Sequence, residues 1–273
     1  MVNPLEQTNP WVRFFRRALF VCSAALVALA LHQSVDRPWV SFLLLVVALL
    51  ALIPPWISRR RFRRLLLSGD AQGVVDAWRR AIESGTHDQA VVALVSATAF
   101  AAYGWVEEAR SQLSKLRRGP LWHASTEHRL FVETLLEAFD GDRDQAVRLA
   151  EAMGQLPVPP VNARLRKQVL TLRGSLAALT RAFAHNARQG DLELLEHVAK
   201  RSPMVSWAMR YAAAVIAVDR GERWRVPRLL ADAPAWPPQS AFKGFHTELL
   251  EQMQRPGGAA DSKDSAGDRS EEA

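Results

Sequence analysis

The chain has very little cysteine, with one Cys in 273 residues. A single cysteine cannot form a disulfide within the chain, and it cannot supply the paired thiolates of a structural zinc site. The sequence also lacks a P-loop, a dinucleotide-binding glycine turn, a nucleophile elbow and a paired metal-ligand motif. No catalytic residue, cofactor-binding residue or metal ligand is recognisable, so we expect neither an enzyme nor a bound cofactor.

Acidic residues are scarce at the N-terminal end, and this local scarcity accounts for the net charge of +7. Residues 1–64 contain nine Arg and two acidic residues, whereas residues 65–253 contain 23 basic and 21 acidic residues. A nucleic-acid-binding domain normally carries a basic patch or stripe, but here basic and acidic residues alternate over most of the chain. We therefore expect no nucleic-acid partner.

Two long apolar runs lie near the N-terminus, at about residues 18–35 and 39–57. The second run carries no charge, and Trp39 and Trp56 would lie about 25 Å apart along a helix, which suits the two interfaces of a bilayer core. The first run is weaker, and a cleaved signal peptide is an alternative interpretation of it. The runs predict a two-helix transmembrane hairpin over residues 18–58.

Arginines flank this predicted hairpin on both sides. They are Arg13, Arg16 and Arg17 before it and Arg59, Arg60, Arg61, Arg63 and Arg64 after it. Because positively charged loops stay in the cytoplasm, residues 1–17 and the C-terminal domain should both be cytoplasmic. The chain has 30 Arg and 5 Lys, which suggests a GC-rich bacterial genome and hence a bacterial inner membrane. Membrane lipids are expected partners of the apolar runs and their basic flanks.

Residues 59–253 follow a helical pattern, rich in Ala, Leu, Arg, Glu and Gln and without alternating β-branched runs. A turn signal recurs at five glycines, which are Gly69, Gly104, Gly141, Gly190 and Gly221. Each glycine should end one helix as a left-handed cap, with the next helix beginning at once. Their spacing, mostly near 34 residues, predicts two-helix repeats.

Two of these turns resemble those of the tetratricopeptide repeat family. They are residues 104–109, Gly-Trp-Val-Glu-Glu-Ala, and residues 141–146, Gly-Asp-Arg-Asp-Gln-Ala. Ala97 and Thr134 stand seven residues before each glycine, where that family packs its two helices closely. Pro238 occupies the family's terminal proline position.

The other turns depart from the family pattern, with Val74, Leu195 and Val226 in place of its alanine. The resemblance covers roughly residues 62–250 and implies an α-solenoid that binds proteins.

A heptad pattern follows a proline-rich loop at residues 157–160 and predicts one long helix over residues 162–189. Its apolar positions are Leu165, Val169, Leu172, Leu176, Leu179 and Phe183. An internal packing stripe is the default interpretation of this seam, and a homodimer interface is the alternative. The loop should divide the domain into residues 62–156 and 161–253. Residues 254–273 contain no large apolar residue and should be disordered.

The predicted fold class is therefore all-α, with a transmembrane hairpin followed by an α-solenoid of tetratricopeptide-like helix pairs. By resemblance, the function would be a membrane-anchored scaffold or assembly factor acting through its cytoplasmic repeats. Candidate partner-binding residues on the first helices of repeats are Arg129, Glu133, Glu137 and Arg210. Trp105 and Trp224 follow two of the turns and should pack between repeats. The alternative is a subunit of a membrane transport or envelope complex in which the hairpin is the working part and the repeats are an adaptor.

Overall fold

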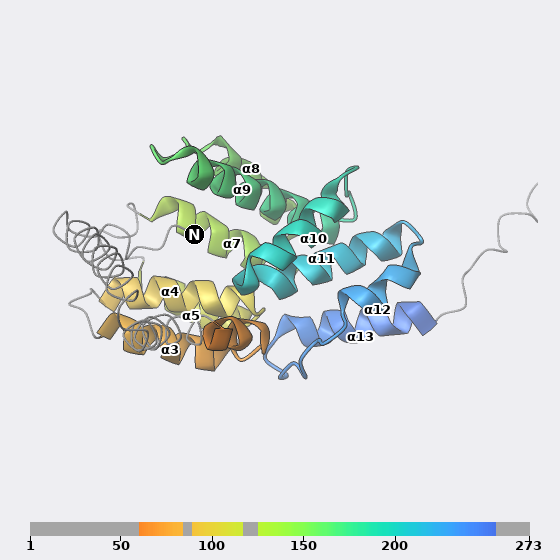
Figure 1. The fold of residues 1–273 in the computed structure, drawn as a ribbon, viewed down its shortest axis with the longest axis horizontal. Coiled ribbons are helices and arrows are strands. Elements are labelled where there is room, and N and C mark those ends of the chain that lie inside the picture. Colours follow the sequence, from red (N-terminus) through yellow and green to blue (C-terminus); the bar gives the residue numbers. More distant parts are fainter. Residues whose placement is uncertain (1–59, 84–88, 117–124, 255–273) are drawn as a thin grey trace, which may run out of the picture. The chain divides into compact units, whose positions relative to one another are not determined.

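The computed structural model describes residues 60–83, 89–116 and 125–254, and all regular structure among them is helical (Figure 1). The chain forms two compact units, one of residues 1–64 with 161–165 and the other of residues 65–160 with 166–273. In the first unit the described residues 60–64 are helical, and the Asn162 side chain accepts a hydrogen bond from the backbone N–H of Leu165 (2.9 Å).

The second unit consists of helices that pack against one another. After the helical residues 65–67 they are α3 (Ala71–Glu83), α4 (Gln89–Ala102), α5 (Val106–Ser114), α7 (Thr126–Asp140), α8 (Arg143–Gln155), α9 (Ala163–Phe183, whose first three residues belong to the first unit), α10 (Asp191–Arg201), η2 (Pro203–Val205), α11 (Ser206–Asp219), η3 (Arg223–Arg225), α12 (Val226–Leu229) and α13 (Ala241–Gln254). Contacts join α4 to α5, α7 to α8, and α10 to α11, and α4 also touches α3 and α7. This arrangement is compatible with a helical-repeat fold.

The predicted fold class requires a correction, because none of the helices in the described residues is long and apolar enough to cross a membrane. The longest of them, α9, has 21 residues but carries four Arg and one Lys. The apolar helix α4 has only 14 residues, which span about 21 Å of a bilayer core about 30 Å thick. The predicted hairpin, the tail beyond Gln254 and their boundaries lie outside the described residues.

The glycine turns are confirmed. Their φ angles are 78° at Gly69, 72° at Gly104, 111° at Gly141, 88° at Gly190 and 75° at Gly221, all in the left-handed region. After two of them an aspartate caps the next helix: Asp70 accepts from the backbone N–H of Gly73 (2.8 Å) and Asp142 from that of Gln145 (2.9 Å).

One position is fully buried in every turn, five residues after each glycine. Its occupants are Val74, Ala109, Ala146, Leu195 and Val226. The three turns that depart from the family's alanine therefore use the position in the same way, with a larger side chain. Ala97 and Thr134 are also fully buried, and the Thr134 hydroxyl donates to the Leu130 carbonyl within α7 (2.6 Å).

Helix α9 ends earlier than the heptad pattern predicts, at Phe183 instead of Gln189. His185 turns the backbone there with a φ of 53°, a conformation that a sequence pattern does not reveal at a histidine. Along the seam, Val169, Leu176, Leu179 and Phe183 are buried within the chain, as an internal packing stripe predicts. The half-buried Leu165 and Leu172 are its other members, and a dimer through the seam stays a prediction.

The last repeat departs most from the predicted pattern. Its second helix is reduced to η3 and the four-residue α12, and a non-helical segment leads from there to α13. Pro238 lies in a turn of this segment, where the Ser240 N–H donates to the Pro237 carbonyl (3.0 Å), and so does not end a helix. The segment instead carries Trp236, whose buried indole N–H donates to the Tyr211 hydroxyl (2.6 Å).

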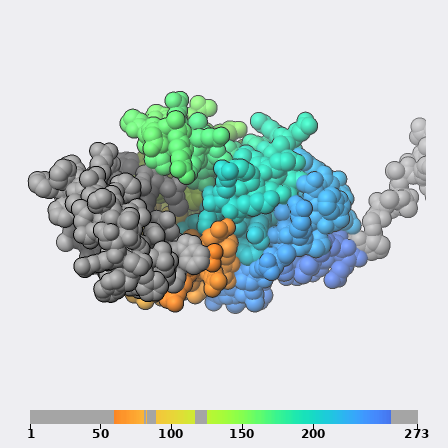
Figure 2. Space-filling model, viewed as in Figure 1, coloured from red at the N-terminus to blue at the C-terminus, as the bar shows by residue number. Residues whose placement is uncertain are grey.

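Residues 234–240, here called the return segment, contact the first two turns of the unit together with Ala241, the first residue of α13. A Cβ at Gly69 would lie 2.5 Å from Cγ of Pro234, so the two residues are in close contact. At the second turn, the Ser240 hydroxyl donates to the Tyr103 carbonyl (2.7 Å) and the Ala241 N–H donates to the Gly104 carbonyl (2.8 Å). Figure 2 shows orange residues, from the start of the described chain, beside blue residues of the C-terminal part.

Aromatic rings from five elements meet where α13 begins. Phe242 is fully buried, and its ring centroid lies 5.2 Å from that of Phe139, 4.9 Å from that of Tyr211 and 5.0 Å from that of Trp236. Phe245 extends the cluster to Phe183 of α9 (4.9 Å). The cluster joins α7, α9, α11, the return segment and α13 into one core.

Candidate partner-binding surfaces

Three of the predicted partner-binding residues lie in one row on α7. Arg129 and Glu133 are one turn apart and form an ion pair (Nε to Oε1, 3.7 Å). Glu137 lies one turn further, with its Oε1 3.8 Å from NH2 of Arg110 on α5, and Arg110 also pairs with Asp140. All three predicted side chains are partly exposed. The row therefore presents paired charges to solvent, and its ions are already oriented by their neighbours.

The fourth predicted residue, Arg210, has different neighbours. Its guanidinium lies 4.7 Å from the centroid of the Trp207 ring, and NH1 donates to the Ala231 carbonyl (3.3 Å). Arg210 therefore contacts its own helix, α11, and the residues that follow α12, whereas the α7 row contacts α5. The structure brings Arg129, Glu133 and Glu137 together and holds Arg210 in another setting.

Some of the residues predicted to lie at the membrane interface are described by the structure, and they all lie on the helical residues 60–67. Arg60, Arg61, Arg63 and Arg64 are all exposed there. The remaining members lie outside the described residues and are Arg13, Arg16, Arg17, Trp39, Trp56 and Arg59.

The two tryptophans that follow turns have opposite environments. Trp105 is half-buried and stacks on Phe100 of α4, with ring centroids 5.7 Å apart, so it is a packing residue, but this contact lies within the α4–α5 pair and not between repeats. Trp224 was also predicted to pack between repeats, and that prediction is wrong because Trp224 is 71% exposed. Trp224 lies on the single turn η3, and Val226, two residues later, takes the buried position instead.

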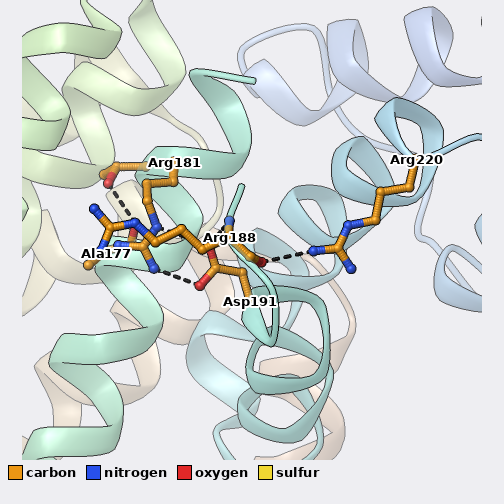
Figure 3. A network of polar contacts seen from close by, with 6 residues as sticks. Ala177, Arg181, Arg188, Asp191 and Arg220 are labelled. Carbon is orange, nitrogen blue, oxygen red and sulfur yellow. Dashed lines mark hydrogen bonds and ion pairs between the residues drawn. The ribbon is translucent and has the colours of Figure 1, made fainter. Parts of the chain in front are cut away.

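An ion pair between a buried carboxylate and a partly buried arginine holds the Gly190 turn (Figure 3). Arg181 on α9 binds the Asp191 carboxylate with two hydrogen bonds, Nε to Oδ2 (2.9 Å) and NH2 to Oδ1 (2.6 Å). The backbone N–H of Arg188 donates to Oδ2 as well (2.8 Å). Burial alone would raise the pKa of Asp191, but the hydrogen bonds and positive charges of Arg181 and Arg188 outweigh it, so the pKa is lowered. The carboxylate is therefore held ionised as the polar centre of this turn.

Two further contacts join this turn to the end of α11. Arg220 NH2 donates to the Arg188 carbonyl (2.8 Å), as Figure 3 shows. His185 Nδ1 lies 3.0 Å from the Asp219 carboxylate. Sequence reasoning missed this network, although Gly190-Asp191 repeats the Gly-Asp order of the turn at residue 141 and could have indicated a structural aspartate.

A second network of ion pairs has Glu196 of α10 at its centre and reaches the Trp224 ring through Arg225. Three cations approach this mostly buried carboxylate: Arg228 NH2 at 3.4 Å, Arg225 NH1 at 3.7 Å and Lys200 Nζ at 3.9 Å. Arg225 Nε also contacts Glu222 (2.8 Å), and its guanidinium carbon lies 5.2 Å from the centroid of the Trp224 ring. We call the set of seven residues the Trp224 patch; it comprises Glu196, Lys200, Glu222, Arg223, Trp224, Arg225 and Arg228.

The described surfaces offer ion pairs and one exposed aromatic ring. Within residues 60–83, 89–116 and 125–254, no three His, Cys, Asp or Glu side chains are grouped so that they could hold a metal ion. Tryptophan and arginine are enriched in the energetically dominant residues of protein interfaces, so recognition of another molecule suits these surfaces.

The comparisons with known proteins found no match to this chain. No protein-family model matches the chain, and no match is found among curated proteins or among solved structures. The chain is therefore characterised by its own packed helices and glycine turns, which are compatible with a helical-repeat fold.

Proposed function

We propose that this chain is a protein–protein interaction scaffold or assembly factor that works at a membrane and binds its partner through the helical domain. The observation that carries the proposal is the repetition of one turn design, a left-handed glycine followed five residues later by a fully buried side chain. Stacked repeats of this kind create extended surfaces that typically bind other proteins.

The row on α7 is the binding surface that we favour. Arg129, Glu133 and Glu137 are partly exposed and already oriented by ion pairs, so a partner with complementary charges would not have to order them. Charges of this kind select the partner and accelerate association.

The membrane location rests on the sequence. The uncharged run 39–57 and the arginines on its C-terminal side support association with a bacterial inner membrane, with both ends of the chain in the cytoplasm. Cell fractionation tests this location: the full chain should be recovered with the membranes, and a C-terminal reporter should be active in the cytoplasm. Recovery in the soluble fraction would contradict it.

Crosslinking in intact membranes, followed by identification of the crosslinked protein, tests the binding surface. Glu137→Lys should lower capture of the main partner about tenfold, because a reversed charge in a complementary interface costs at least 1.4 kcal/mol. Glu251→Lys on the exposed side of α13 is the matched control and should leave capture unchanged. Equal capture by both variants would show that the partner binds elsewhere.

A further inference from the structure

The Trp224 patch does not belong to the proposed protein-binding row, and its chemistry differs. Two of its cations project furthest into solvent: the side chains of Lys200 and Arg228 are 73% and 68% exposed, whereas that of Glu196 is 16% exposed. Arg225 and Glu222 are both partly exposed. The patch contains four basic residues and two acidic ones. Its outer surface is therefore positive and complements an anionic partner.

The exposed ring stands alone among charged side chains. Only two other large apolar residues in the described chain are exposed, Leu170 on α9 and Leu250 on α13. The core of a protein interface normally gathers several apolar side chains, whereas Trp224 is the only exposed large apolar residue of the patch. A single tryptophan among arginines instead matches the interfacial region of a bilayer, where the indole ring sits at headgroup level and basic side chains meet anionic lipids.

We propose that the Trp224 patch docks the helical domain onto an anionic lipid surface. Trp224 enters the headgroup region, and the exposed ends of Arg228 and Lys200 bind lipid phosphates and carboxylates. Each basic residue near such a surface contributes about 1 kcal/mol. The proposal rests on the proposed membrane location, because a domain tethered to the membrane meets its lipids at high effective concentration.

The ion pairs of the patch support this role. Glu196 and Glu222 both contact the partly exposed Arg225, and Arg225 in turn lies against the Trp224 ring. Because Arg225 is already oriented by these two carboxylates, it loses little conformational freedom on docking.

The test uses the purified full chain in bilayers of phosphatidylcholine, with or without about 30% phosphatidylserine, which serves as the anionic probe lipid. Backbone hydrogen exchange over residues 221–230 is measured, with α8 as the internal reference. We expect exchange in this segment to slow about fivefold with phosphatidylserine, and the effect to weaken at high salt. Equal exchange in the two bilayers would overturn the proposal.

Three variants assign the effect to the patch. Trp224→Ala and Arg228→Glu should abolish the slowing, whereas Arg148→Glu, an exposed charge reversal on α8, should leave it intact. Persistence of the slowing in the first two variants would overturn the proposal. A photocrosslinker at position 224 that captures a protein in intact cells, and no lipid, would also overturn it and assign the patch to a protein partner.

The lipid-docking proposal and the proposed function can fail independently of each other. Capture of the partner through α7 should be the same in Arg228→Glu as in the native chain. If the chain is recovered in the soluble fraction, its flotation with phosphatidylserine vesicles measures the patch directly, and flotation that does not depend on Arg228 overturns the proposal.

Discussion

Two glycines with nearly the same backbone geometry occupy very different surroundings. Gly69 has a φ of 78° and Gly221 a φ of 75°, so both need the left-handed conformation. A Cβ at Gly69 would lie 2.5 Å from Pro234, whereas nothing lies within 4 Å of a Cβ at Gly221. The first glycine therefore serves both the turn and the close approach of the return segment.

Alanine substitution separates these two roles. Gly221→Ala should lower the free energy of unfolding by about 1–2 kcal/mol, the cost of a left-handed backbone at a residue with a side chain. Gly69→Ala should lose a further 1–3 kcal/mol or so, because its methyl group overpacks against Pro234. Urea unfolding of the purified chain measures both, and equal losses would mean that the return segment does not lie against the first turn.

The ion pair of Asp191 and Arg181 makes a second prediction. Asp191→Asn should cost about 3–5 kcal/mol, because it leaves the Arg181 guanidinium without its carboxylate. The exposed Asp144→Asn on α8 is the control and should change the free energy of unfolding by less than about 0.5 kcal/mol.

The pair of Asp191 and Arg181 should also make the free energy of unfolding depend on pH. Since the pKa of Asp191 is lowered by folding, its stabilisation is present at neutral pH and is lost as the pH falls through the folded-state pKa. The difference in unfolding free energy between the native chain and Asp191→Asn should therefore shrink below about pH 4. A difference that stays constant through that range would contradict the prediction.

At the scale of elements, the glycine turns and the helical class could be predicted from the sequence, because a left-handed cap favours glycine and helical periodicity is a local signal. The row on α7 followed from the same periodicity, since Arg129, Glu133 and Glu137 are one turn apart. The end of α9 could not be predicted, because His185 carries no local signal for its left-handed backbone. Trp224 was misassigned because an apolar side chain after a turn looks the same whether it is buried or exposed.

Long-range packing was also beyond the sequence pattern. The contact of α13 with the Gly104 turn joins residues far apart in the chain, and no periodicity records such a pairing. Arg210 was grouped with the α7 row from its place in a first helix, but its actual neighbours depend on where α11 meets the residues after α12.

Helix α13 should be a structural element of the domain. Phe242→Ala removes a fully buried ring from the aromatic cluster and should cost about 3–5 kcal/mol. Leu250→Ala, on the same helix but 38% exposed, should cost less than about 1.5 kcal/mol. Thermal unfolding followed by circular dichroism measures the two, and similar losses would show that α13 is only loosely attached.

At the scale of the whole unit, the return segment links the first turns to the last helices. Trp207 adds to this link, since its indole N–H donates to the Leu67 carbonyl (3.0 Å). An open repeat array unfolds as a series of neighbouring units, whereas contacts between its early and late parts make unfolding cooperative.

We therefore expect one unfolding transition for residues 65–254. Hydrogen exchange in low denaturant should give α4 and α11 the same opening free energy. Trp236→Ala, which removes a buried ring of the return segment, should separate the two values. Different opening free energies in the native chain would contradict a closed unit.

The return segment also has a consequence for synthesis. The Gly69 turn leaves the ribosome well before Pro234 and Ser240 are made, an interval of roughly ten to thirty seconds at a synthesis rate of about 5–20 residues per second. During that interval the carbonyl groups of Tyr103 and Gly104 and the rings that will surround Phe242 lack their final partners. The early helices can form as they emerge, but the domain completes its core only when Trp236, Phe242 and Leu249 arrive, and until then it is a natural client for chaperones.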